Sequence, residues 1–403
     1  MYDAIVVGAR CAGAPTAMLL AREGYSVVLL DRATFPSDTV STHIVKYPAV
    51  SRLESWDLLD EVLATGCPPI TRCTSDYGDG PVSGRPPPPD EIPIIAPRRT
   101  ILDEILVEAA LEAGAELREE FVVRELLTDG DRVVGIEGQH RGGPTETMRA
   151  RMVIGADGKN SLVARSVEAP TYDDVPPQAF WHYTYWPELP VDGLEWHWRH
   201  HEFVLAIPTN DDLTCLMVGR PIEYLQEFRT DIESSYHDVV AIAPEFADVV
   251  ERVDPVGGFV GTAVPNYFRR PYGPGWALVG DAGLCMDPLM GHGISDALCD
   301  AELLAEAVDA GLSERRPLED ALAEYEATRN ERKAPYYERN WQGARFEGWD
   351  RPEELQLRAA LREDPEQANR WAGTIAFSVG LDEFYSSEFV SGARSAVPDS
   401  GAG

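Results

Sequence analysis

The chain begins with a strand-and-turn segment that determines its fold, Ala4-Ile5-Val6-Val7-Gly8-Ala9-Arg10-Cys11-Ala12-Gly13. The apolar run ends at a glycine, as in a buried parallel strand, and a helical stretch follows from Ala14 to Arg22. Gly24 ends that helix, and a second apolar run, Val27 to Leu30, leads to Asp31. The segment therefore predicts a βαβ unit, which is the start of an α/β fold with a parallel sheet.

The turn inside this unit has the chemistry of a dinucleotide-binding turn. Gly8 permits the sharp change of direction, and Gly13 lets the helix lie close to the strand. The helix N-terminus offers free N–H groups and a positive dipole end to a pyrophosphate. Asp31 ends the second strand, where an acidic residue accepts hydrogen bonds from ribose hydroxyls. Arg10 replaces the middle glycine, so its side chain must point away from the phosphates or pair with them.

Two later segments again place glycine and a carboxylate at the end of an apolar strand. They read Val153-Ile154-Gly155-Ala156-Asp157-Gly158 and Trp276-Ala277-Leu278-Val279-Gly280-Asp281. Parallel sheets bind ligands at this carboxyl edge, although a simple turn is the alternative for the first of these two segments. After the second segment, Gly291-His292-Gly293 precedes a helix that begins at about Ile294. This loop would allow backbone N–H groups to approach a planar, electron-accepting ring.

Together, and in this order, the three motifs resemble the FAD-dependent monooxygenase superfamily of the p-hydroxybenzoate hydroxylase type. That group includes geranylgeranyl-reductase-like enzymes and flavin halogenases, and the resemblance covers roughly residues 1–330. It implies FAD as the cofactor, with NADH or NADPH docking transiently because no second nicotinamide-binding unit is visible. The residues it assigns to FAD are Gly8, Ala9, Arg10, Cys11, Ala12, Gly13, Asp31, Arg32, Arg99, Asp157, Gly158, Gly280, Asp281, Pro288, Gly291, His292, Gly293 and Ile294.

The resemblance also implies roles for particular residues. Asp31 would hold the adenosine ribose, and Asp281 would hold the ribityl chain. Asp157 belongs to the DG motif of the family, and Arg99 matches an arginine that reaches FAD, with Arg98 as a competitor in register. The loop from Pro288 to Ile294 would face the isoalloxazine.

The chain departs from the family in two of these motifs. Gly283 and Leu284 stand where the family's GDAAH motif continues to its histidine, and Arg10 replaces a glycine. The WxWxIP motif of halogenases is not found around Trp196-His197-Trp198, and the context of Lys46 does not match the halogenase lysine. A halogenase is therefore disfavoured.

The order of the elements predicts an α/β chain in which a Rossmann-like FAD-binding domain carries an inserted antiparallel β-sheet substrate domain. We expect the FAD-binding domain at residues 1–70, 97–170 and 266–330, and the insert at 71–96 and 171–265. A C-terminal helical region at 331–390 and a flexible tail at 391–403 would follow. A helix is expected from about Ile101 to Ala113, and the proline-rich stretch from Pro68 to Pro97 should be an extended connector across the surface.

The inserted region is rich in aromatic residues that either line a substrate pocket or form a packed sheet core. Trp181, Tyr183 and Phe203 are the candidates for the pocket. No catalytic residue can be assigned; His43, His182 and His292 are weak candidates, because packed histidines are commoner than catalytic ones.

Composition excludes several classes of protein. The formal net charge of −33 argues against binding to nucleic acid or to an anionic membrane surface. No apolar run is long enough for a membrane span and no secretory signal is visible, so we expect a cytoplasmic protein without integral membrane association. The cysteines lack paired spacing, so no metal site is expected. We also expect a positive pocket in an acidic shell, formed by Arg10, Arg98, Arg99, Lys159 and Arg165.

The leading hypothesis is an NAD(P)H- and O2-dependent monooxygenase. It would hydroxylate or epoxidise a small hydrophobic or aromatic molecule through a flavin hydroperoxide. The alternatives are a geranylgeranyl-reductase-like flavin reductase or dehydrogenase and a non-redox flavin-binding protein. The protein is expected to be a monomer or a homodimer, and the sequence does not name the substrate.

Overall fold

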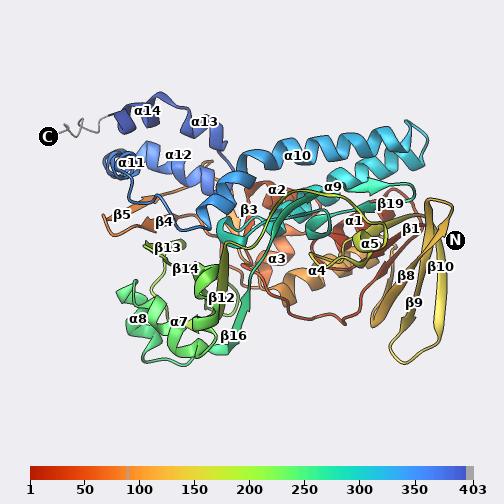
Figure 1. Ribbon diagram of the computed structural model, residues 1–403, viewed down its shortest axis with the longest axis horizontal. Coiled ribbons are helices and arrows are strands. Elements are labelled where there is room, and N and C mark those ends of the chain that lie inside the picture. Colours follow the sequence, from red (N-terminus) through yellow and green to blue (C-terminus); the bar gives the residue numbers. More distant parts are fainter. Residues whose placement is uncertain (89, 396–403) are drawn as a thin grey trace.

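The N-terminal βαβ unit forms the centre of a mostly parallel sheet in the computed structural model, which describes residues 1–88 and 90–395 (Figure 1). The strand order is β18-β19-β10-β1-β2-β7, and β18 is antiparallel to its neighbour. These strands are β18 (Tyr272–Gly273), β19 (Trp276–Leu278), β10 (Thr145–Gly155), β1 (Tyr2–Val7), β2 (Val27–Leu30) and β7 (Glu116–Arg118). Val7 is in register with Leu30 and Gly155, and Gly155 with Leu278. All three sequence motifs therefore begin at the same edge of the sheet.

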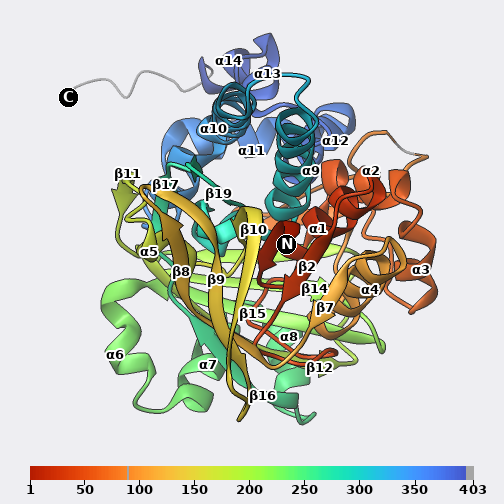
Figure 2. The ribbon, with the colours of Figure 1, turned by 90° about the vertical axis from the view of Figure 1, so that its right-hand side faces the viewer.

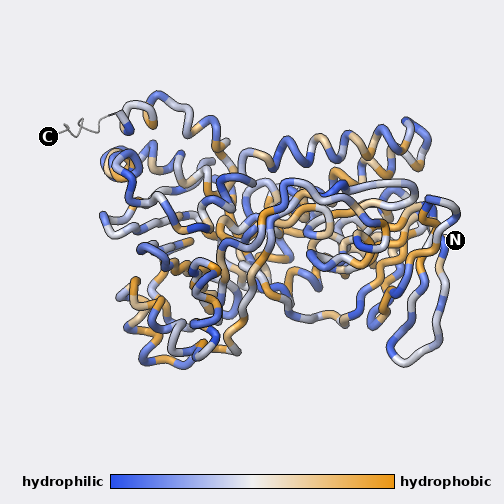
Figure 3. The backbone as a smooth tube through the Cα atoms, viewed as in Figure 1, coloured by the Kyte–Doolittle hydropathy of each residue, from blue (hydrophilic) through white to orange (hydrophobic). Residues whose placement is uncertain are grey.

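Helices cover one face of this sheet and a β-meander covers the other (Figure 2). The helices are α1 (Gly13–Arg22), α4 (Arg99–Glu112) and α9 (Gly293–Leu312), and the meander is formed by β8 (Phe121–Asp129), β9 (Arg132–His140) and the first half of β10. In β1, Ala4 and Val6 pack among the helices, whereas Ile5 and Val7 pack against the meander. Burial on both faces explains why β1 is apolar without alternation, as the tube in Figure 3 shows for the strands of this region.

A second sheet, made largely of antiparallel strands, forms the insert. Its order is β16-β12-β15-β14-β13-β4-β5. The strands are β16 (Val256–Thr262), β12 (Ala179–Pro187), β15 (Leu213–Pro221), β14 (Glu202–Pro208), β13 (Leu194–Arg199), β4 (Cys73–Asp76) and β5 (Pro81–Gly84). Three helices pack on what we call its outer face: α6 (Leu225–Phe228), α7 (Ile232–Val240) and α8 (Pro244–Val250).

C-terminal helices pack against the opposite, inner face of the insert (Figure 1). They are α11 (Pro352–Glu363), α12 (Pro365–Ala376), α13 (Leu381–Tyr385) and α14 (Glu388–Ser395). Trp371 of α12 lies near Trp196, and Trp349, in the loop before α11, lies near Trp198. The long helix α10 (Leu318–Gly343) leads into this group of helices, so the domain boundary expected at residue 330 falls inside a helix. Residues 391–395, expected in a flexible tail, end α14, and the rest of that tail lies outside the described residues.

Short elements complete the two domains. They are β3 (Val45–Lys46) paired with β6 (Ile94–Ile95); a sheet of β11 (Thr171–Val175), β17 (Asn266–Arg269) and β20 (Leu284–Cys285); the helices α2 (Tyr47–Ser55), α3 (Leu59–Ala64) and α5 (Leu162–Ser166); and the 3₁₀ turns η1 (Ile222–Tyr224), η2 (Gly280–Ala282) and η3 (Pro288–Met290).

The α/β fold class with an inserted sheet and C-terminal helices is confirmed. The expected connector across the surface at 68–97 differs, because that stretch supplies β4, β5 and β6. Pro81 opens β5, an edge strand, where a residue without an N–H group is tolerated. Across residues 1–88 and 90–395, every helix is too short or too polar to span a bilayer.

Candidate cofactor and active site

The glycine turns of the three motifs are in direct contact. A Cβ added at Gly13 would lie 1.7 Å from the Gly8 carbonyl oxygen, and one added at Gly8 would lie 2.4 Å from the Ala156 oxygen. A Cβ at Gly280 would lie 2.8 Å from the Ala12 Cβ atom. Only glycine allows the first helix to approach both neighbouring turns this closely. The turns therefore form one continuous backbone surface at the N-terminus of α1.

The acidic residues of the first two motifs are fixed by backbone N–H groups. Asp31 accepts from the N–H groups of Ala9 and Ala33, both at 2.8 Å, while Arg32 beside it is exposed. Asp157 accepts at Oδ2 from Leu162 N at 2.6 Å, and its buried Oδ1 has no partner among the described residues. Burial raises the pKa of Asp157. Its unpartnered oxygen leaves a hydrogen-bond position for a ligand beside Gly158.

Asp281 lies just after β19, in the turn η2, and is exposed to solvent. Burial nevertheless raises the pKa of this carboxyl, and the positive charges of Lys159 and Arg99 lower it. The acid of the third motif therefore lies near cations from the second motif and from α4.

Arg10 and Arg99 converge on a residue that the sequence reading missed, Asp103 of α4. Arg10 Nη1 is 2.6 Å from Asp103 Oδ2, and Arg99 binds both carboxylate oxygens of Asp103. The Cys11 thiol donates to Asp103 at 3.2 Å, and burial raises the pKa of that thiol. Arg10 also donates to the Ser37 carbonyl and hydroxyl groups. The Arg10 side chain is thus directed toward α4 and the segment after β2. Because Arg10 and Asp103 are 93 positions apart, the sequence gave no signal of this contact.

The remaining cations have different surroundings. Arg98 lies with its guanidinium 4.8 Å from the Tyr185 ring centroid and pairs with Asp211, so it faces the insert rather than Asp103. Arg165 donates to the Asn160 carbonyl.

The loop expected to face a flavin ring turns at Gly291, whose φ is 61°. A Cβ there would lie 2.9 Å from Ile44 Cδ1, whereas Gly293 is exposed, with open space beside its Cα at the start of α9. His292 is buried between Tyr336 and Phe377, and burial lowers its pKa well below the ordinary value. Pro288 and Ile294 bracket this loop. Its backbone near Gly293 is therefore presented outward, while the His292 ring points into the core.

His43 joins the cofactor side to the insert. Its Nε2 is 2.7 Å from the Tyr185 hydroxyl of β12, and its Nδ1 is buried without a partner among the described residues. Burial, together with the charges of Arg99 and Arg98, lowers the pKa of His43 to about 3. The ring is therefore neutral at physiological pH.

The other candidates in the insert separate onto different faces. His182 points to the outer face, 4.7 Å from the Phe228 ring, so it lies across the sheet from His43. Trp181 and Phe203 point inward but pack edge to face at 5.6 Å in a buried aromatic cluster. Tyr183, whose hydroxyl accepts from Ser41 N at 3.3 Å, is the pocket candidate that lies beside His43.

All three lysines of the chain are held by contacts around these motifs. Lys159 Nζ donates to Thr262 of β16 at 3.1 Å, which ties the second motif to the insert. Lys333 Nζ donates to Asp296 of α9 at 2.5 Å. Lys46 Nζ lies 3.7 Å from the Phe377 ring centroid, and burial lowers its pKa to about 7.

These residues fit FAD. The glycine surface at the α1 N-terminus suits a pyrophosphate, and the free Asp157 oxygen and accessible Asp281 suit hydroxyl groups. In agreement, the model of the FAD binding domain family matches residues 1–339.

Relatives of known sequence and structure fall among flavin enzymes. The chain is 27% identical over 363 residues to digeranylgeranylglycerophospholipid reductase 1 of Methanococcoides burtonii, covering 85% of this chain and 80% of the relative. It is 27% identical over 358 residues to kynurenine 3-monooxygenase of Salinispora arenicola, covering 81% and 75%. The structure of the flavin-dependent brominase Bmp2 superposes with a TM-score of 0.78 at 19% identity, covering 98% of each chain. With the motifs in contact and the family model spanning most of its length, the chain belongs to the FAD-binding domain family of flavin-dependent oxidoreductases.

Proposed function

We propose that this protein is an NAD(P)H- and O2-dependent FAD monooxygenase that hydroxylates or epoxidises a hydrophobic, aromatic small molecule. The observation that carries the proposal is the buried pair of His43 and Tyr185 between the cofactor motifs and the insert. For hydroxylation, NAD(P)H gives two electrons, one oxygen atom of O2 enters a C–H bond of the substrate, and the other leaves as water. FAD supplies the electron transfer and the oxygen activation when it is bound.

The position of the pair supports this role. Arg99 and Arg98 are close enough to His43 to lower its pKa, and Arg99 also acts on Asp281. Ile44, the next residue, abuts Gly291 of the loop assigned to the flavin ring. His43 therefore lies where a substrate in the insert would meet the cofactor.

The chemistry of the pair suits a substrate with a hydroxyl or amino group. A neutral imidazole has one donor and one acceptor nitrogen, and Nε2 is taken by Tyr185. Nδ1 remains for a polar atom of the substrate, which would remove the cost of leaving it unpaired, about 1–3 kcal/mol. Tyr183 and Tyr185 add aromatic surface on the same face. We assign His43 and Tyr185 the task of orienting the substrate ring.

The test uses purified, FAD-loaded protein and a panel of phenols and anilines. We expect one substrate class to accelerate flavin reduction by NADH or NADPH and to give oxygenated product with oxygen consumption. Tyr185→Phe should lower product yield relative to NAD(P)H oxidised and release hydrogen peroxide instead, whereas Tyr224→Phe on the outer face should not. Reduction that never leads to an oxygenated product would contradict the proposal.

The second candidate is a flavin reductase acting on an alkene, and the likeness to a digeranylgeranylglycerophospholipid reductase favours it. Substrate reduction under strictly anaerobic conditions would select this candidate over the monooxygenase. Halogenation is not favoured, because Leu205 and Phe203 occupy the positions before Ile207-Pro208 where a WxWxIP motif requires tryptophan.

A further inference from the structure

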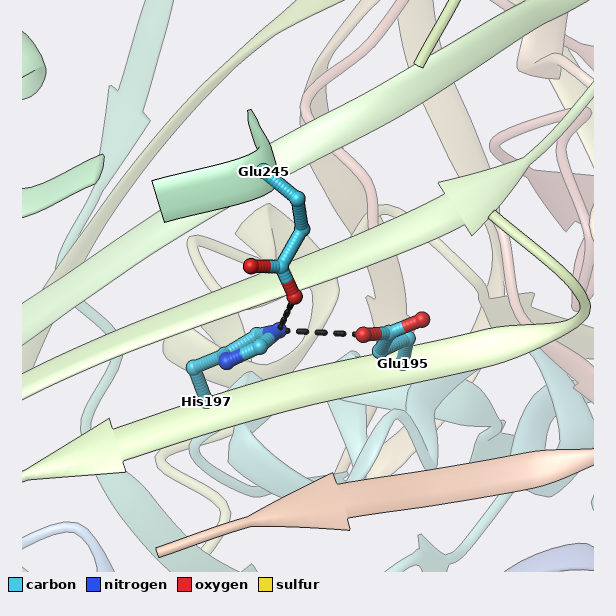
Figure 4. A group of neighbouring side chains, drawn as sticks. All are labelled: Glu195, His197 and Glu245. Carbon is cyan, nitrogen blue, oxygen red and sulfur yellow. Dashed lines mark hydrogen bonds and ion pairs between the residues drawn. The ribbon is translucent and has the colours of Figure 1, made fainter. Parts of the chain in front are cut away.

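Three side chains that the proposed reaction does not use meet on the outer face of the insert. Glu195 and His197 come from β13 and Glu245 comes from α8 (Figure 4). His197 Nε2 is 3.1 Å from Glu195 Oε1 and 3.6 Å from Glu245 Oε1. One ligand atom from each residue lies within 4.8 Å of the others.

The sequence creates this cluster through strand alternation and one helix contact. Residues 195 and 197 share a face of β13 because they are two positions apart, whereas Leu194, Trp196 and Trp198 point into the inner core. The His197 ring packs edge to face against Phe246 of α8 at 5.2 Å, next to Glu245. This packing holds a 3% exposed imidazole beside the two carboxylates.

The charge around His197 is strongly negative. A third carboxylate, Asp76 of β4, lies 3.9 Å from the other ring nitrogen, Nδ1, which has no hydrogen-bond partner among the described residues. Asp76 is paired with Arg199 at 3.2 Å. Across the described residues, neither Glu195 nor Glu245 forms an ion pair with arginine or lysine. Among the described residues, His197 is therefore the only ion-pairing partner of Glu195 and Glu245, and no arginine or lysine balances the negative charge of these two carboxylates.

We propose that Glu195, His197 and Glu245 bind a divalent transition-metal ion, with Zn²⁺ as the best match. Imidazole and carboxylate oxygen are common zinc ligands, at about 2.0–2.2 Å from the ion. Tetrahedral ligands at that range are separated by roughly 3.3–3.6 Å. Of the two distances from Nε2, 3.1 Å lies just below this range and 3.6 Å lies at its upper end. A water molecule would take the fourth position, and Asp76 would orient the ring from its Nδ1 side.

Such a site would be structural. The sheet separates it from His43, because β13 turns residues 195 and 197 away from the inner face. A bound metal ion would cross-link α8 to β13 and so stabilise the packing of the outer-face helices on the insert sheet. The spacing of the cysteines predicts no metal site, but this cluster contains no cysteine, and Glu245 is brought to β13 only by the fold.

The test is a titration of the FAD-loaded, metal-stripped protein with ZnCl2, followed by calorimetry and thermal unfolding. We expect one saturable zinc ion per chain and a higher melting temperature. Glu245→Gln and Glu195→Gln should each weaken binding by at least tenfold without changing flavin content. Glu251→Gln, an exposed change at the end of the same helix, is the matched control and should bind as the parent does.

X-ray absorption at the zinc edge gives a direct readout of the ligands, and one imidazole with oxygen ligands is expected. His197→Gln should abolish saturable binding, and the two glutamate variants keep the test decisive if that variant does not fold. Absence of saturable binding, or equal binding by Glu245→Gln and Glu251→Gln, would overturn the proposal.

Discussion

The cofactor side and the insert position their side chains by different physical means. On the cofactor side, backbone approaches backbone: Gly13 lies against the Gly8 carbonyl, and the acids at the strand ends bind neighbouring N–H groups. In the insert, position depends on which face of a strand a residue occupies, so Trp181 and His182 are neighbours in sequence and point to opposite cores. The first kind of site tolerates almost no change in backbone shape, whereas the second tolerates changes that preserve side-chain packing.

The largest effect should come from Gly13→Ala. Its Cβ would meet the Gly8 carbonyl oxygen at 1.7 Å, which neither backbone can avoid without separating α1 from β1. We expect a loss of about 4 kcal/mol or more in unfolding free energy and loss of bound flavin. Flavin absorbance per chain and denaturant unfolding measure both. Gly258→Ala in β16 is the control, because the added Cβ would meet no atom within 4 Å. If both variants lost the same stability and the same flavin content, the proposed difference between the two regions would be wrong.

The second prediction concerns Asp103→Ala. This change leaves Arg99 buried and Arg10 half-buried without their shared carboxylate. Removing one partner of a buried ion pair costs about 3–5 kcal/mol, so the melting temperature should fall sharply and flavin affinity should fall with it. Glu104→Ala, at the adjacent position of α4, is the control for helix propensity. A stable Asp103→Ala protein with normal flavin content would show that the arginines do not need this acid.

In the insert, Tyr236→Phe should have a smaller and local effect. The Tyr236 hydroxyl accepts from Trp186 Nε1 at 3.1 Å and donates to the Leu216 carbonyl at 2.7 Å. Loss of two buried hydrogen bonds should cost about 2 kcal/mol. Flavin content should not change, because these residues belong to the outer core. A drop in flavin binding would mean that the two regions are more tightly coupled than their packing indicates.

The smallest effect expected is the pH dependence from His43 within the narrow window from pH 6.5 to pH 5, where it stays below about 2 kcal/mol. Burial lowers its pKa from 6.5 to about 3, so the unfolded chain takes up the proton first as the pH falls. Stability from this group is complete above pH 6.5 and decreases toward pH 3, by at most about 1.4 kcal/mol for each pH unit. His43→Asn, which suits the positive φ of 61°, should flatten this part of the curve. An unchanged slope in chemical unfolding between pH 5 and pH 6.5 would refute this assignment.

The parts of the site that the sequence predicts are those whose geometry is local. Gly8, Asp157 and Asp281 each follow an apolar strand directly, and parallel register alone brings such strand ends to one edge. Asp103 was missed because its contact with Arg10 depends on how α1 and α4 pack, although its spacing of four from Arg99 was a usable signal.

The insert was harder to predict for a physical reason. His43 and Tyr185 are 142 positions apart, and their contact requires a sheet from one domain to meet a loop from the other. Alternation indicates that residues of β12 have two faces, but not which face meets the cofactor. From the sequence, Trp181 and Phe203 could therefore be either pocket residues or core residues. The structure places both in the core.

The arrangement of the lysines has a practical consequence for labelling. Since the other basic side chains are arginines, the side-chain amines of this sequence are limited to three lysines. Lys46 and Lys333 are buried, and Lys159 is half-buried and hydrogen-bonded to Thr262. An acylating dye or an activated-ester surface would therefore react slowly with every lysine side chain of the folded protein, so efficient amine labelling needs a lysine introduced at an exposed position.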